Sequence, residues 1–247
     1  MNQVQQPLVS IITVVYNAVR TLEQTILSVL NQDYSSIEYI IIDGGSTDGS
    51  LAIVEKYRSR IAYYCSEPDQ GIYDAMNKGL QQATGAFVGI LNADDFYELS
   101  AVRTVVQAFQ ANSQIHVVHG LLRILDAQDE PDTIVGHAAN FLNFGMIEHP
   151  TCFVKKSIYE QMGGFDLAYS RAGDYELMLR IRKAGATFWF LPVILANFRK
   201  GGLSVSWQSS LETINLRYRY GYISKLRRMF LLAYWYLNYT LFTKKIK

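Results

Sequence analysis

Residues 87–95 constrain the fold of this chain more than any other segment. An apolar run from Phe87 to Leu91 ends abruptly in Asn92, and Asp94 and Asp95 follow after one alanine. Such runs are typical of a strand buried in a parallel sheet, and ligands in open α/β sheets bind beyond the carboxyl ends of these strands. Carboxylates there can hold a divalent cation, and the cation can hold a diphosphate. The alternative is a polar turn that caps the next helix, because Asp is a favourable N-cap residue.

Apolar runs of strand length alternate with helical patterns along the chain. Strands are predicted over residues 8–15, 37–42, 61–65, 86–92, 115–118, 121–125 and 187–191, and helices over 22–30, 50–60, 72–83, 101–111 and 174–184. Thr21 and Gln24 have the spacing of a capping box at the first helix. Residues 126–145 are polar and are expected to be irregular. The alternation predicts an α/β fold with a mainly parallel, Rossmann-like sheet and flanking helices.

The length and cysteine content limit the class of protein. A chain of 247 residues forms one large domain, or one domain with an appendage, and can bury a proper core. Cys65 and Cys152 provide neither a disulfide framework nor the spacing of a zinc site, which favours a reduced compartment. Residues 1–7 lack the order of a secretion signal, and the longest uncharged run of the tail, Met229–Phe242, has 14 residues. Because a membrane span needs about 20 residues, an enzyme located in the cytoplasm is expected.

The charges divide unevenly between the body and the C-terminus. Residues 217–247 contain eight Lys or Arg and no Asp or Glu, so 15 basic and 22 acidic residues precede them. Basic residues beside aromatic and aliphatic ones are typical of a helix that lies in a membrane interface. The alternative is a terminal helix that packs on the domain or on a second subunit, forming a homodimer. The acidic body argues against nucleic acid as a partner.

Polar residues end three of the predicted strands. Tyr16, Asp43 and Asn92–Asp95 would share one edge of a parallel sheet, where Asp43 could hold a base or ribose and Asp94 a metal–diphosphate. No Gly-x-Gly-x-x-Gly follows the first strand, and no phosphate loop ends in Gly-Lys-Ser/Thr, so dinucleotide redox chemistry and ATP hydrolysis of those types are disfavoured. A carboxylate-held Mg²⁺ or Mn²⁺ is then the natural means of neutralising a departing diphosphate.

Four segments in order carry a family resemblance: Val9–Asn17, Ile40–Ser50, Asp69–Gly79 and Leu91–Asp95. Together they resemble the family 2 glycosyltransferases, inverting enzymes of the GT-A fold, over about residues 8–205. The resemblance implies a nucleotide-diphosphate sugar donor, a divalent metal (Mn²⁺ or Mg²⁺) and a hydroxyl acceptor on an oligosaccharide or a polyprenyl-linked sugar, as in bacterial surface-polysaccharide assembly. It divides the chain into a GT-A catalytic domain (1–210) and a basic, amphipathic helical tail (211–247), of which 217–247 would touch the inner face of the cell membrane peripherally.

The resemblance also implies roles for single residues. Tyr16 and Asp43 match positions that hold the nucleotide base, while Asp69, Asn77 and Lys78 lie in a segment that lines the donor site. Asn92, Ala93 and Asp94 match the family's Asp-x-Asp motif, with Asp94 as the metal ligand. Asn92 replaces an aspartate that is often found there, so it can bond a ribose hydroxyl but brings no charge to the metal. Asp95 would either assist the metal site or cap the next helix, and the cap is favoured.

An inverting transfer needs a base for the acceptor hydroxyl, and Asp174 is the candidate. The family's Glu-Asp motif falls here, with Gly173 in place of its first acid, although Asp174 could also be only a helix N-cap. Glu176 is a rival base, but two positions along a helix turn its side chain about 200° away. His149 would face the cleft and contact the donor phosphate or the acceptor, or else be structural. Arg199 and the residues after it would lie in a flexible loop over the donor.

Two other functions compete with the inverting glycosyltransferase. The first is a nucleotidyltransferase that makes sugar nucleotides, but the glycine-rich, basic loop that such enzymes carry after the first strand is absent, since Asn17–Arg20 stands there. The second is a non-catalytic, membrane-associated protein that binds sugar nucleotides. Retention of both Asp94 and Asp174 argues against this second alternative.

Overall fold

One mixed sheet runs through the chain, as seen in the computed structural model, which describes residues 6–200 and 206–244, with side chains up to Leu237. Its strand order is β3-β2-β1-β4-β8-β6-β9-β5, and β7 pairs with β6 outside this path. The strands are β1 (Val9–Val15), β2 (Ile37–Asp43), β3 (Tyr63–Ser66), β4 (Phe87–Asn92), β5 (Phe96–Tyr97), β6 (Val117–Leu125), β7 (Pro131–Val135), β8 (Phe153–Lys155) and β9 (Phe188–Arg199).

The N-terminal half of the sheet is parallel. β1 pairs with β2 on one side and β4 on the other, and the register sets Val15 opposite Asp43 and Val14 opposite Asn92. All three strands are apolar over most of their length because both faces of this part of the sheet are covered. The polar residues that follow them therefore meet at one edge, as the sequence predicted.

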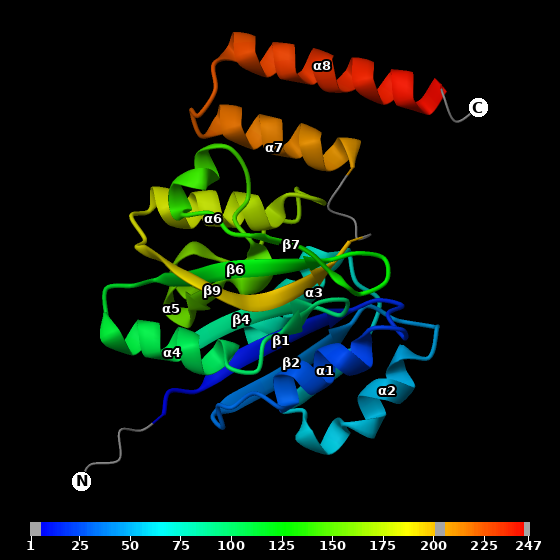
Figure 1. Ribbon diagram of the computed structural model, residues 1–247, viewed down its shortest axis with the longest axis vertical. Helices are drawn as coiled ribbons and strands as arrows, with labels where there is room; N and C mark the ends of the chain where they lie inside the picture. The colour runs from blue at the N-terminus through cyan, green and yellow to red at the C-terminus, as the bar shows by residue number, and fades with distance from the viewer. Residues whose placement is uncertain (1–5, 201–205, 245–247) are drawn as a thin grey trace.

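Helices cover both faces of the sheet (Figure 1). They are α1 (Leu22–Leu30), α2 (Ser50–Lys56), α3 (Ile72–Gln82), α4 (Ala101–Ala111), α5 (Lys156–Met162), α6 (Gly173–Lys183), α7 (Trp207–Arg219) and α8 (Lys225–Lys244). Side chains of α1, α2 and α4 share one buried cluster, and those of α3, α5 and α6 share the cluster on the opposite face. The predicted α/β fold with flanking helices is confirmed.

Three local predictions were wrong. Thr21 is the N-cap of α1 but its side chain makes no capping hydrogen bond, so no capping box forms. The stretch 126–145 was expected to be irregular, yet it contains β7, which pairs with β6. The strand expected over 187–191 continues to Arg199 because β9 pairs with β6 along its whole length, across register shifts near Leu121. Through this extension Arg199 reaches the edge of the sheet that carries Asp94.

The C-terminal helices are stacked on the domain, with α7 below α8 (Figure 1). The predicted division between residues 210 and 211 falls inside α7, whose Ile214 and Leu216 are buried. Leu216 belongs to the same apolar cluster as α3 and α6, so α7 is packed as part of the domain. None of the described helices is both long and apolar enough to span a bilayer.

His119 on β6 gives the fold a pH dependence that can be tested. The residue is fully buried beside Phe188 and Phe190, and neither ring nitrogen has a hydrogen-bond partner among the described residues. Burial lowers the pKa of His119 to about 4. The unfolded chain takes up this proton near pH 6.5 and the folded protein does not, so stability is fully present above pH 6.5 and is lost as the pH falls toward 4.

We expect His119→Leu to remove this loss. Between pH 6.5 and 4 the free energy of unfolding of the wild type should fall, relative to the variant, by about 1.4 kcal/mol per pH unit. Urea unfolding of both proteins at a series of pH values measures the difference. Parallel pH profiles for the two proteins would contradict the assignment.

Candidate functional site

The loops after β1 and β2 are joined by hydrogen bonds. The amide of Asn17 donates to Ser46 Oγ at 2.8 Å, and the amide of Thr47 donates to Asn17 Oδ1 at 2.9 Å. Asn17 takes a left-handed conformation with φ of 49°, which Asn tolerates better than most residues. Tyr16, just before it, is 67% exposed. The edge predicted to hold the nucleotide base is thus a fixed platform with an open aromatic ring.

Asp43 is fully buried at the end of β2 and organises this platform. Its carboxylate accepts hydrogen bonds from the amides of Gly45 and Ser46 and from the hydroxyls of Ser46 and Ser66, at 2.5–3.0 Å. Four donors to one carboxylate fix the turn after β2. The sequence predicted contact with a base or ribose; the contacts described here are internal, and a direct contact with nucleotide stays a prediction.

Asp69 lies against the same turn. A Cβ atom on Gly44 would stand only 2.3 Å from Asp69 Oδ2, so glycine leaves the space that this carboxylate fills. The other oxygen accepts from the amide of Gly71 at 2.8 Å. Two acidic residues that are 26 positions apart in the sequence are in this way brought to one corner of the edge.

Asn77 and Lys78 form contacts within the protein. The Asn77 side chain donates to the carbonyl of Phe165 at 2.9 Å and accepts from its amide at 2.7 Å, which joins α3 to the turn after α5. Lys78 makes ion pairs with Glu67 and Asp74. The sequence predicted that both residues line the donor site; in the structure Asn77 positions the loop that leads toward Asp174.

The end of β4 carries Asp94, which is partly buried. Burial raises the pKa of this carboxyl group, and the positive charge of Arg199 acts in the opposite direction. Arg199 is itself buried and donates to the Asp94 carbonyl at 2.6 Å, to Asp129 at 2.7 Å and to Gln24 at 2.5 Å. Arg199 was expected in a flexible loop, but it is the last residue of β9 and supports the backbone of the Asp94 turn.

Asp95 does not cap a helix, which corrects the favoured interpretation. β5 separates it from α4, whose N-cap is Ser100. The side chain is fully buried, and neither carboxyl oxygen has a hydrogen-bond partner among the described residues. Burial, and after it the neighbouring Asp94, raises the pKa of Asp95 well above its usual value. Next to it, Ala93 is buried and bonds Val14 and Thr25 through its backbone.

The residues at this edge fit a divalent metal ion that binds together with the phosphates of a substrate. No three His, Cys, Asp or Glu side chains cluster around a common point in the described parts of the chain, so no all-protein metal cage is present there. Asp94 provides one carboxylate, and the neighbouring Asn92 Oδ1 is buried without a partner among the described residues. Mg²⁺ and similar ions are often held by one or two carboxylates plus substrate phosphates and water. A single carboxylate at this edge satisfies that pattern.

Asp174 is the second residue of α6. It is not the helix cap, because the N-cap is Ala172 and no side chain caps this helix. Instead its Oδ1 accepts a hydrogen bond from the Tyr73 hydroxyl at 3.0 Å. Gly173 makes this possible, since a Cβ atom there would meet the Tyr73 ring at 2.9 Å. The ring of Tyr73 thus occupies the space that a side chain at position 173 would need, where the family's motif has its first acid.

His149 is close to the same carboxylate. Its ring packs edge-on against Phe165 with centroids 6.1 Å apart. Burial lowers the pKa of His149, and Asp174 acts in the opposite direction. The imidazole is therefore neutral at physiological pH. It can donate one hydrogen bond to a polar ligand and accept another without adding charge.

Comparison with known proteins identifies the family of the chain. The model of the family described as Glycosyl transferase family 2 matches residues 10–154, more than half of the chain. The chain belongs to this family. It is 34% identical over 179 residues to a glycosyltransferase of Mycobacterium tuberculosis, covering 70% of this chain and 68% of the relative. It is also 26% identical over 215 residues to a PGL/p-HBAD biosynthesis glycosyltransferase of Mycobacterium bovis, covering 80% and 79%.

Solved structures show that this family 2 glycosyltransferase has the GT-A fold. S. aureus TarS in complex with UDP-GlcNAc superposes with a TM-score of 0.71 at 17% identity, over 92% of this chain and 71% of that one. The mannosyltransferase PcManGT from Pyrobaculum calidifontis, in complex with GDP-Man and Mn²⁺, gives a TM-score of 0.70 at 20% identity, over 95% and 70%. At these identities the likeness concerns the fold alone.

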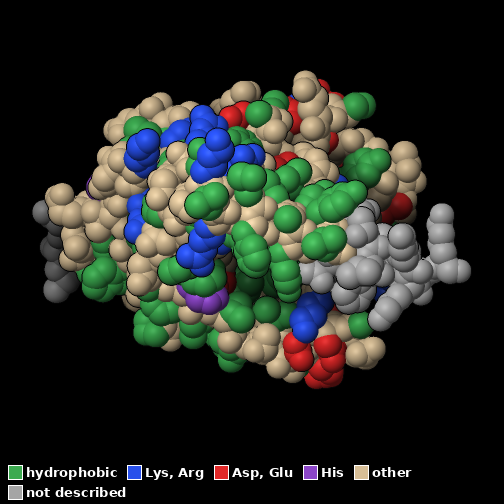
Figure 2. Space-filling model, turned by 90° about the horizontal axis from the view of Figure 1, so that it is seen from above, with side chains coloured by type: hydrophobic (Ala, Val, Ile, Leu, Met, Phe, Trp, Pro, Cys, Tyr) green, Lys and Arg blue, Asp and Glu red, His purple; other side chains and the backbone are tan. Residues whose placement is uncertain are grey.

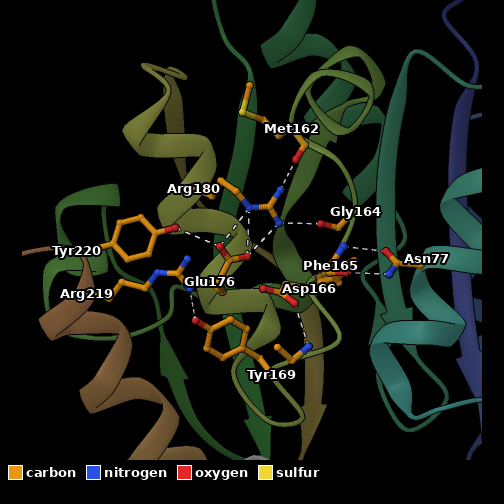
Figure 3. Close-up of polar contacts among 11 residues, drawn as sticks. Asn77, Met162, Gly164, Phe165, Asp166, Tyr169, Glu176, Arg180, Arg219 and Tyr220 are labelled. Carbon is orange, nitrogen blue, oxygen red and sulfur yellow. Dashed lines mark hydrogen bonds and ion pairs between the residues drawn. The ribbon is translucent and has the colours of Figure 1, made fainter.

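Glu176, the rival base, has a structural role in this glycosyltransferase (Figure 3). It is buried, forms an ion pair with Arg180 at 3.0 Å and accepts from the Tyr220 hydroxyl at 3.1 Å. Arg180 also donates to the carbonyls of Met162 and Gly164. The group joins α5, α6 and α7, and its carboxylate is fully engaged.

A cavity of about 390 Å³ beside this group is separate from the strand edge. It is lined by Met162, Arg180, Lys183, Ala184, Arg219 and Tyr220. These residues come from the carboxyl ends of α5, α6 and α7, where backbone carbonyls create negative potential. The basic side chains offset that potential, and the lining includes none of Asp43, Asp69 and Asp94.

Proposed function

We propose that this glycosyltransferase is an inverting enzyme, with Asp174 as general base. In the proposed reaction Asp174 takes the proton of the acceptor hydroxyl, and the acceptor oxygen attacks the anomeric carbon of the donor sugar. The bond from that carbon to the diphosphate breaks on the opposite face, and the nucleoside diphosphate leaves. The observation that carries the proposal is the Asp174 carboxylate, which caps no helix and is held by the Tyr73 hydroxyl. A positioned base of this kind contributes roughly 10²–10⁴-fold to rate.

The donor in this proposal is a nucleotide-diphosphate sugar held at the edge formed by β1, β2 and β4. The structural neighbours support this class of donor, since TarS was solved with UDP-GlcNAc and the mannosyltransferase with GDP-Man. Asp94, with Asn92 beside it, would hold a divalent cation, which would act as a Lewis acid on the diphosphate. Arg199 would keep the Asp94 turn in place by donating to the Asp94 carbonyl.

The proposed acceptor is a hydroxyl of an oligosaccharide or of a lipid-linked sugar. One relative is a chondroitin synthase of Escherichia coli, 27% identical over 72% of this chain and 27% of its own length, and another takes part in PGL/p-HBAD biosynthesis. These names support a role in the assembly of a polysaccharide or glycolipid.

The exposed side chains of α8 support the proposal that the protein binds at a membrane surface. Leu226, Met229 and Phe230 are exposed by 78%, 56% and 68%, and they follow the spacing of one helical face. Figure 2 views this end of the molecule and shows hydrophobic side chains beside a group of Lys and Arg. An exposed apolar face flanked by basic residues fits a helix lying in the interface of an anionic membrane. We propose peripheral contact through α8 with the cytoplasmic face.

Asp174→Asn tests the general base. The substitution keeps the shape of the side chain but removes its ability to take a proton, so kcat should fall roughly 10²–10⁴-fold while donor binding stays within a few-fold of wild type. Transfer assays and calorimetry with UDP-, GDP- and dTDP-sugars measure the two quantities. Asp166→Asn, an exposed aspartate of the preceding loop, is the matched control. Wild-type turnover in Asp174→Asn would remove Asp174 as the base.

Asp94→Asn tests the metal ligand. The variant should lose the Mn²⁺-dependent part of donor affinity, roughly 10-fold or more, because the carboxylate charge at this edge is removed. Donor titrations with Mn²⁺ or with EDTA measure it, and the variant with Mn²⁺ should resemble the wild type with EDTA. An undiminished response to Mn²⁺ in the variant would assign the ligand elsewhere.

Met229→Glu combined with Phe230→Glu tests the membrane face in the full chain. The pair removes apolar area and adds negative charge, so sedimentation with vesicles of phosphatidylcholine and phosphatidylglycerol should decrease strongly. Lys225→Gln and Arg227→Gln should weaken binding only to the anionic vesicles, by about 1 kcal/mol each. Leu99→Glu, at an exposed leucine outside α8, is the control. Equal sedimentation of all these proteins would exclude α8 as the contact.

A further inference from the structure

We propose that Glu212 of α7 is a positioning residue for the transfer reaction, because it holds the loop 170–172 that leads directly into Asp174. This inference rests on the proposed role of Asp174 as the base. It gives Glu212, which the sequence assigned to a separate tail from residue 211 onward, a role in positioning Asp174.

Glu212 collects four hydrogen bonds from this loop. Its Oε1 accepts from the amide and from the hydroxyl of Ser170, both at 3.1 Å. Its Oε2 accepts from the amide of Arg171 at 2.9 Å and from the amide of Ala172 at 2.8 Å. Three successive backbone amides that point at one carboxylate form a concave anion site, and hydrogen bonds to a charged acceptor are the stronger kind.

Among the described contacts, only Glu212 accepts hydrogen bonds from the backbone amides of residues 170–172. Ala172, the N-cap of α6, has no side chain that could cap the helix, and Gly173 follows it. A carboxylate placed before the first turn also interacts favourably with the positive end of the helix dipole. Since Asp174 is only two residues beyond Ala172, the position of its carboxylate follows the position of this loop.

Other side chains of α7 also form hydrogen bonds with the segment 165–172. Gln208 donates to Ser170 Oγ at 2.9 Å, and Arg219 donates to the Tyr169 hydroxyl at 2.7 Å. At the other end of the segment Asn77 holds Phe165, as Figure 3 shows. The loop is thus fixed between α3 and α7, and of these contacts only Glu212 binds the residues next to the helix start.

The donor edge is built from other elements. Asp43, Asp69 and Asp94 take their described contacts from the strand ends, from segment 67–71 and from Arg199, not from α7. Loss of the Glu212 contacts should therefore change the step that uses Asp174 and leave donor binding intact. A residue that only stabilises the fold would not separate these two quantities.

Glu212→Gln in the full-length enzyme tests the inference. The amide keeps one acceptor oxygen and turns NH₂ toward amides that also donate, so we expect kcat to fall about tenfold or more with donor KM and Kd within about twofold. Hydrogen–deuterium exchange at the amides of 170–172 should become faster, while exchange in β1 and β4 stays as in wild type. Leu216→Ala, a buried α7 residue without a polar role, is the control for stability. It should lower the melting temperature and leave kcat unchanged below the transition.

The outcomes separate the possibilities. Wild-type kcat or unchanged exchange in Glu212→Gln would overturn the inference, and so would an equal loss of kcat in Leu216→Ala, which would make the effect one of stability alone. If Asp174→Asn retained wild-type turnover while Glu212→Gln were slow, the base assignment would fail and the inference in its present form would be overturned with it. If Asp174→Asn were inactive and Glu212→Gln normal, only the role of Glu212 would fail.

Discussion

The site depends on the parallel pairing of β1 with β2 and β4. Backbone hydrogen bonds fix the register, so the polar residues that end the apolar runs emerge at neighbouring levels, with Val15 beside Asp43 and Val14 beside Asn92. A slip of one residue in any of these strands would exchange the side chains that pack on its two faces, and the close packing of both buried clusters opposes this. The hydrophobic effect, acting on the strands, thereby places polar groups that are far apart in the sequence at one edge.

Much of this arrangement could be predicted from the sequence. Short apolar runs that end in polar residues are a local signal, and they predicted the parallel half of the sheet and the edge with Asp43 and Asp94, while a helical pattern predicted the start of α6 near Asp174. The family resemblance, which the comparisons confirm, added the class of enzyme. These predictions succeeded because each depends on a pattern within about ten neighbouring residues.

The parts that could not be predicted depend on pairs distant in the sequence. Tyr73 reaches Asp174 across 101 positions, and nothing around either residue indicates the contact. The apolar run of β9 looks complete near Leu191, but pairing with β6 extends the strand to Arg199. Asp95 resembles a helix cap because Asp is a favourable N-cap residue, although β5 and the packing of α1 against this turn bury it. In each case tertiary contacts override a local preference.

The C-terminal hairpin combines two surfaces of different chemistry. α7 turns Leu216 into the core and Glu212 toward the loop before Asp174, whereas α8 carries exposed Leu226 and Phe230 away from the domain. Composition alone merges the two helices into one basic, aromatic tail, because both contain Arg and Tyr. What distinguishes them is the single carboxylate of Glu212, the last acidic residue in the sequence. Its position divides the hairpin into a helix that bonds the loop before Asp174 and a helix on which Leu226 and Phe230 are exposed.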